Sequence, residues 1–141
     1  MRHLAILILA VAAIGATRPA AAAPAYEQGI AAILRARCAG CHRDADASGG
    51  LSVETFARLS AGGESGAAIV PGDAAASLLV QRLEATDDAH MPPADQPQPS
   101  AAEKERLRAW IAAGAPGPAA DRSILADLVV PTLPQIGRAH V

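Results

Sequence analysis

Two cysteines and a histidine stand together in the order Cys38-Ala39-Gly40-Cys41-His42. Two thiols three positions apart, near the end of a helix, can each add across a vinyl group of haem. The adjacent imidazole then lies under the iron as its proximal ligand. This spacing is the attachment site of haem c, so it predicts one covalently bound haem and a redox function.

Met91 is the residue best suited to fill the sixth position of the iron. It lies in a loop stiffened by Pro92 and Pro93, which can present one thioether at low entropic cost, whereas a methionine that fills the core belongs on a packed helix face. The rival is His90, because imidazole also binds haem iron. Adjacent residues of an extended segment point to opposite sides, so we expect only one of the two to reach the iron.

Three further residues are candidate supports for the haem. The ring N–H of His42 that faces away from the iron needs an acceptor, and the turn that contains Pro71 is the hypothesis for it. Arg82 is a candidate partner for a haem propionate, and Trp110 for packing at the haem edge. Both also have ordinary interpretations, as a solvated arginine and a core tryptophan.

The apolar spacing predicts where the helices that position these residues lie. Residues 24–37 form the first helix, with one apolar stripe of Tyr26, Ile30, Ile33 and Leu34 that leads to Cys38. A brief helix is expected at 54–59. A middle helix is expected to follow Asp73 as its N-cap and to end near residue 84, with Leu78, Leu79 and Leu83 on its buried side.

The second half of the chain carries the clearest boundaries. Residues 87–99 are rich in proline and therefore cannot be helical, so we expect an extended, stiff loop around Met91. Ser100 and Glu103 are spaced as a capping box that begins the last helix. Gly114 and Pro116 should stop that helix after Trp110.

The two ends of the chain are interpreted separately from the domain at 24–118. Residues 1–23 have a positive start, a stretch of twelve apolar residues and a small-residue cleavage site, which predicts a secretory signal peptide; a membrane span needs roughly 20 apolar residues. We therefore expect an exported, periplasmic protein without a stable membrane span. Residues 119–141 are an unassigned tail or the start of a further, truncated domain, and residues 136–141 resemble a translated sequencing adapter.

Composition limits the classes of partner and the stability of the core. Without Arg2 and Arg18 the 12 basic residues fall to 10, against 14 acidic ones, so the processed chain has a net charge of −4 and nucleic acid is not expected as a partner. Aromatic residues are few, and much of the apolar content is alanine, which buries little area. We expect the domain to need haem as part of its core.

Taken together, these motifs resemble the class I cytochrome c fold and, within it, the planctomycete-type cytochrome c domain family. The resemblance covers about residues 26–118 and implies an all-α domain of three to four helices around a covalently bound haem. It implies Cys38 and Cys41 as thioether anchors, His42 as proximal and Met91 as distal ligand, and a crossing of the first and last helices at the haem. It depends on the haem motif, Gly49-Gly50-Leu51, the segments 62–66 and 68–73, Ser77-Leu78-Leu79, Met91-Pro92-Pro93 and residues 110–116.

The leading hypothesis for the function is outer-sphere electron transfer with His/Met axial ligation, to a redox partner protein or an attached redox domain. On this hypothesis the chain is not itself an enzyme. The alternatives are a haem peroxidase or ligand sensor with a displaceable distal ligand, and the electron-entry module of a larger oxidoreductase. A thioredoxin-like thiol pair would need a βαβ pattern, and a zinc site would need a second pair of ligands; the sequence shows neither.

Overall fold

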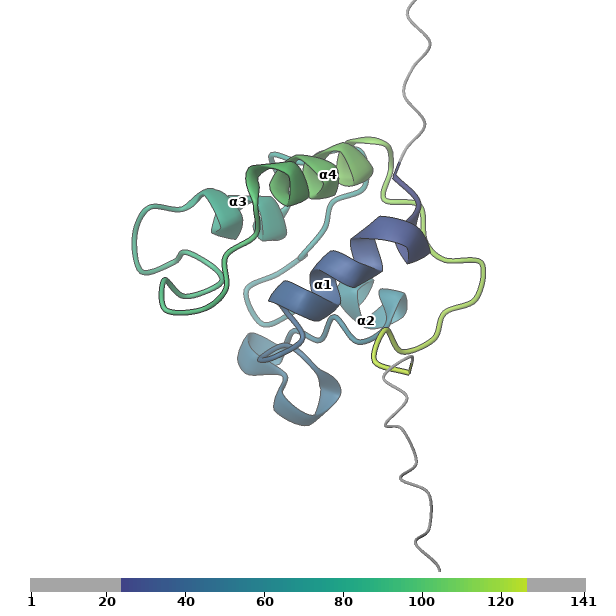
Figure 1. The fold of residues 1–141 in the computed structure, drawn as a ribbon, viewed down its shortest axis with the longest axis horizontal. Helices are drawn as coiled ribbons and strands as arrows, with labels where there is room; N and C mark the ends of the chain where they lie inside the picture. The colour runs from purple at the N-terminus through teal and green to yellow at the C-terminus, as the bar shows by residue number, and fades with distance from the viewer. Residues whose placement is uncertain (1–23, 127–141) are drawn as a thin grey trace, which may run out of the picture.

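The computed structural model describes residues 24–126 (Figure 1). Within this range the chain forms four α-helices and no strand, which confirms the all-α class. A single isolated bridge pairs Gly63 with Gly66. The helices are α1 (Ala31–Arg37), α2 (Phe56–Ala61), α3 (Leu78–Glu84) and α4 (Ala101–Ala112), with a π-helical turn (Tyr26–Ile30) before α1 and two 3₁₀ turns (Asp44–Asp46 and Ser48–Gly50) after it.

The N-terminal helix follows the predicted range, with its first turn wound as a π-helix that runs directly into α1. All four residues of the predicted apolar stripe, from Tyr26 to Leu34, are buried. The helix ends at Cys38, whose backbone N–H and that of Ala39 both bond to the carbonyl oxygen of Leu34. The haem motif therefore begins at the point where α1 stops.

The brief second helix begins two residues later than predicted. Thr55 is its N-cap, and the Thr55 hydroxyl accepts a hydrogen bond of 3.2 Å from the backbone N–H of Arg58. The carboxylate of Asp121 accepts two more, from the N–H groups of Phe56 at 2.8 Å and Ala57 at 3.0 Å. These bonds satisfy N–H groups that the first turn of a helix leaves without partners.

The predicted N-cap of the middle helix is wrong. Asp73 instead closes the preceding turn, because its carboxylate accepts from the N–H of Ala76 at 2.9 Å, and α3 begins after Ser77. The buried Ser77 hydroxyl accepts from the N–H of Val70 and donates to the carbonyl oxygen of Asp73, both at 2.8 Å. The helix ends at Glu84, as expected.

The capping box of the last helix is confirmed. Ser100 accepts from the N–H of Glu103 at 3.2 Å, and Glu103 accepts from the N–H of Ser100 at 2.7 Å. Helix α4 ends at Ala112, two residues before Gly114, which has a φ of 95°. The left-handed conformation at that glycine stops the helix where the sequence predicted.

An aromatic cluster joins α4 to the N-terminal helix. The ring centroids of Tyr26 and Trp110 lie 5.9 Å apart, and Phe56 lies 5.4 Å from Tyr26 and 6.4 Å from Trp110. Trp110 is fully buried, and its indole N–H donates to the carbonyl oxygen of Pro116 at 3.0 Å. Tyr26 and Trp110 belong to the buried core, Phe56 packs against it, and in Figure 1 α4 lies above the first helix.

The packed unit continues past Pro118, at least as far as Ile124. The N–H of Ile124 donates to the carbonyl oxygen of Glu54 at 2.8 Å, and Arg35 donates to the carbonyl oxygen of Ile124 at 3.2 Å. Ile124 is itself buried. The predicted signal peptide and residues 127–141 of the tail lie outside the described range. Within residues 24–126, none of the helices is both long enough and apolar enough to cross a membrane.

Candidate functional site

An apolar cavity of about 510 Å³ lies between the end of α1, α3 and the loop from α3 to α4. That volume falls within the usual range for cofactor pockets. The haem motif and the Met91 loop, which are far apart in the sequence, both contribute to its wall. Its aliphatic lining residues include Ile33, Leu51, Val53, Ala68, Leu78, Leu79, Leu83 and Leu107.

All three residues of the haem motif that could do chemistry line this cavity: Cys38, Cys41 and His42. A turn brings them together, because the N–H groups of Cys41 and His42 both bond to the carbonyl oxygen of Cys38. Cys38 is half-buried and Cys41 is exposed. Burial raises the pKa of the Cys38 thiol to about 11, so at neutral pH this side chain is a neutral thiol.

The imidazole of His42 carries a buried polar atom that finds no partner. Within residues 24–126, Nδ1 of this ring is enclosed and makes no hydrogen bond. An unpaired polar atom in an apolar wall is costly, so the ring suits a site in which a bound group fixes its orientation. The backbone on either side is held, since the carbonyl oxygen of His42 accepts from Val53 at 2.8 Å.

The structure does not bring the Pro71 turn to His42. Pro71 is exposed and is not part of the cavity wall. The N–H of the next residue, Gly72, donates instead to the carbonyl oxygen of Ile111 at 2.8 Å, which ties the turn to the end of α4. The acceptor predicted for the His42 ring is therefore not supplied by this turn.

Met91 lines the cavity from the side of the loop between α3 and α4. Its N–H donates to the carbonyl oxygen of Arg82 at 2.9 Å, which anchors the loop to α3. The Met91 side chain is 38% exposed, although it is large and apolar. Such a side chain at the edge of an apolar cavity is available to a group held inside it.

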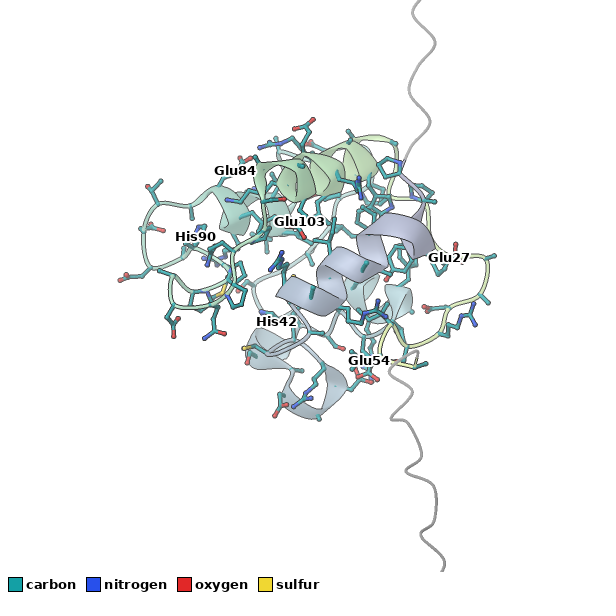
Figure 2. All side chains as sticks on the ribbon, in the orientation of Figure 1. Glu27, His42, Glu54, Glu84, His90 and Glu103 are labelled. Carbon is teal, nitrogen blue, oxygen red and sulfur yellow. The ribbon has the colours of Figure 1, made fainter. Side chains whose placement is uncertain are left out.

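The ring of His90 makes its contacts with residues of its own loop and with the end of α3. Its Nδ1 lies 2.8 Å from the carbonyl oxygen of Ala85, and its Nε2 lies 2.9 Å from Oε1 of Gln98. His90 is not among the residues that line the cavity, whereas Met91 is. Figure 2 shows His42 at the end of α1 and His90 on the loop that follows α3. This geometry favours Met91 over His90 as the residue that reaches a bound haem.

Of the supporting residues predicted from the sequence, the structure brings Arg82 to the cavity but not Trp110. Arg82 is half-buried in α3, and Trp110 lies in the aromatic cluster. Leu78 and Leu79, predicted only as residues on the buried side of the middle helix, are half-buried and line the cavity. Their apolar character predicts burial but does not distinguish packing on the core from a place in a cavity wall.

The residues around the cavity fit a haem attached through Cys38 and Cys41. The wall supplies two thiols at the required spacing, an imidazole with an unpaired buried nitrogen and a thioether, with aliphatic side chains between them. Within the described residues, no three His, Cys, Asp or Glu side chains gather into a site for a free metal ion.

The fold and the cavity together define a small all-α domain of the cytochrome c type. Residues 38–95, which include both the haem motif and the Met91 loop, match the family described as Planctomycete cytochrome C. This segment is similar to the planctomycete-type cytochrome c domains, which agrees with the resemblance seen in the sequence. Neither the curated proteins nor the solved structures gave a match. The family suggests a haem-binding domain that takes part in electron transfer.

Proposed function

We propose that this chain is an exported mono-haem c-type cytochrome domain that carries electrons by outer-sphere transfer, with His42 and Met91 as the axial ligands. One observation carries the proposal: both residues, together with Cys38 and Cys41, line a single apolar cavity. The export depends on the signal peptide predicted for residues 1–23. A redox partner protein or an attached redox domain would supply and accept the electron.

The chain's own residues hold and shield the cofactor. Thioethers at Cys38 and Cys41 would keep it attached, and the aliphatic wall would shield it from water. A bound haem supplies a one-electron change at its iron, and ligation by histidine and methionine raises the potential of that change. Arg82 lines the cavity and would pair with a propionate.

The spectrum of the oxidised, matured protein tests the ligand assignment. We expect a sulfur–iron charge-transfer band at the red end of the spectrum, lost in Met91→Ala and kept in His90→Ala. A haem stain on a denaturing gel should label the wild-type chain and not a Cys38→Ala, Cys41→Ala double variant. The reverse pattern for Met91 and His90 would overturn the assignment, and so would a strongly negative midpoint potential.

The exposure of Met91 favours one alternative, a haem peroxidase or ligand sensor in which an external ligand displaces the thioether. Met91 is 38% exposed and lies on a loop, so its displacement would not disturb the helices. The ferric protein should distinguish the two functions. A low-spin spectrum that ignores cyanide at micromolar concentration and is unchanged by peroxide supports electron transfer, whereas ready binding of either supports the alternative.

A further inference from the structure

The loop that carries Met91 is short of hydrogen-bond donors. Four of its positions, 92, 93, 97 and 99, are prolines, which have no backbone N–H. Carbonyl oxygens in such a loop have few backbone donors within reach, such as the N–H of Gln96, which donates to Pro93 at 2.9 Å, and the others need donors from side chains or solvent. The backbone N–H of Met91 reaches back to α3, but this bond anchors only the residue itself.

Gln98 supplies the missing donors. Its side-chain nitrogen lies within hydrogen-bond distance of three carbonyl oxygens of the loop, those of Pro92 at 3.1 Å, Pro93 at 2.8 Å and Gln96 at 3.0 Å, and its two N–H groups are shared among them. Its side-chain oxygen lies 2.9 Å from the ring nitrogen Nε2 of His90. One amide therefore joins the residue before Met91 to the two residues after it.

From these contacts we propose that Gln98 is a positioning residue that holds the Met91 thioether at the cavity. Gln98 does not line the cavity wall, so it acts through the loop and not through contact with the haem. This inference rests on the proposed function, since it assigns a purpose to the position of the Met91 sulfur. The ring of His90 lies between Oε1 of Gln98 and the carbonyl oxygen of Ala85 at the end of α3, and a neutral imidazole donates to one of these two oxygens at a time.

Removing the Gln98 amide should raise the population of loop conformations in which Met91 has left the cavity. The carbonyl oxygen of Pro92 would then exchange the Gln98 amide for water, and that of Pro93 would keep only the backbone N–H of Gln96, at 2.9 Å. The loss of hydrogen bonds of ordinary strength should raise that population roughly tenfold. An external ligand binds only when the thioether has left, so its apparent affinity should rise by the same factor.

The test compares the matured ferric wild type with Gln98→Ala, Gln98→Glu and Gln96→Ala. Gln98→Glu keeps an acceptor for His90 but lacks the N–H donors. Gln96→Ala is the matched control on the same loop: Gln96 lines the cavity, but its side-chain amide donates to the exposed Asp95 and to none of the loop carbonyl oxygens that Gln98 reaches. The readouts are the sulfur–iron band, the cyanide dissociation constant and hydrogen exchange of peptides that cover residues 86–99.

We expect both Gln98 variants to bind cyanide roughly tenfold more tightly and to exchange faster over the loop, with the control like wild type. Wild-type behaviour of either Gln98 variant in cyanide binding and exchange would overturn the inference. A wild type that lacks the sulfur–iron band would instead overturn the Met91 ligation of the proposed function. The exchange data would still decide whether Gln98 braces the loop, so the two failures can be told apart.

Discussion

Glu103 connects the first turn of α4 to the last residue of α1, so its replacement should lower the stability of the domain by a predictable amount. Its carboxylate closes the capping box of α4 and also pairs with Arg37, the last residue of α1, through contacts of 3.2 to 3.3 Å. Arg37 immediately precedes the haem motif. Both side chains are about one quarter exposed, at 28% and 24%.

The expected cost of Glu103→Ala follows from these two interactions. Loss of a cap costs about 1 kcal/mol, and a partly exposed ion pair contributes between about 0.2 and 1 kcal/mol. We therefore expect the free energy of unfolding to fall by about 1 to 2 kcal/mol. Urea denaturation of the matured protein, followed by circular dichroism of the helices, measures this change in the free energy of unfolding. Urea is uncharged, so it does not screen the ion pair.

The stabilisation that Glu103 contributes should decrease as the pH falls. Hydrogen bonds from the Ser100 backbone N–H, and then from the Ser100 side chain and Arg37, lower the pKa of Glu103 below its ordinary value. A carboxyl group whose folded pKa is depressed stabilises the protein fully above its unfolded pKa of about 4.3. That contribution is lost as the pH falls through the folded pKa, so the difference between wild type and Glu103→Gln should shrink below about pH 4.

A double-mutant cycle and a control complete this test. Glu103→Ala combined with Arg37→Ala should show a coupling energy of about 0.5 kcal/mol. Glu105→Gln is the matched control on the same helix, because its carboxylate is 75% exposed and lies 3.8 Å from Arg108. Purely additive effects of Glu103 and Arg37, or a wild-type advantage that grows toward acid pH, would refute the reasoning.

Two further substitutions test the packing of the domain, at Trp110 and at Gly63. Trp110→Phe should lower the free energy of unfolding by about 1 to 3 kcal/mol, because packing and the hydrogen bond to Pro116 are lost. The sulfur–iron band and the midpoint potential should stay unchanged. A shift of the potential would instead place Trp110 at the haem. Gly63→Ala should cost about 1 to 3 kcal/mol in the same urea assay, because an added Cβ would lie 2.7 Å from the carbonyl oxygen of Gly49. Gly29→Ala is its control, since there the nearest atom, at 3.3 Å, belongs to the flexible side chain of Arg106, and an equal cost in both variants would contradict the steric argument.

Local chemistry explains why several features could be predicted from the sequence. The capping box of Ser100 and Glu103 involves residues three apart, so its formation needs only one helical turn. The spacing of Cys38, Cys41 and His42 similarly brings the three to one turn, because the backbone bonds that close it lie within the motif. The N-cap of α3 was mispredicted because Ser77 bonds to Val70, seven residues away.

The sequence alone determined that this domain is helical and where its last helix begins. It also determined that two thiols and an imidazole have the spacing of a haem attachment site. Each of these features depends on neighbours along the chain. Only the tertiary structure decided that Met91 lines the cavity while His90 is bound to Ala85 and Gln98. It also placed Trp110 in the aromatic cluster rather than at the cavity. These choices depend on contacts between residues far apart in sequence or on the path of a loop, and neither is encoded in the spacing of a motif.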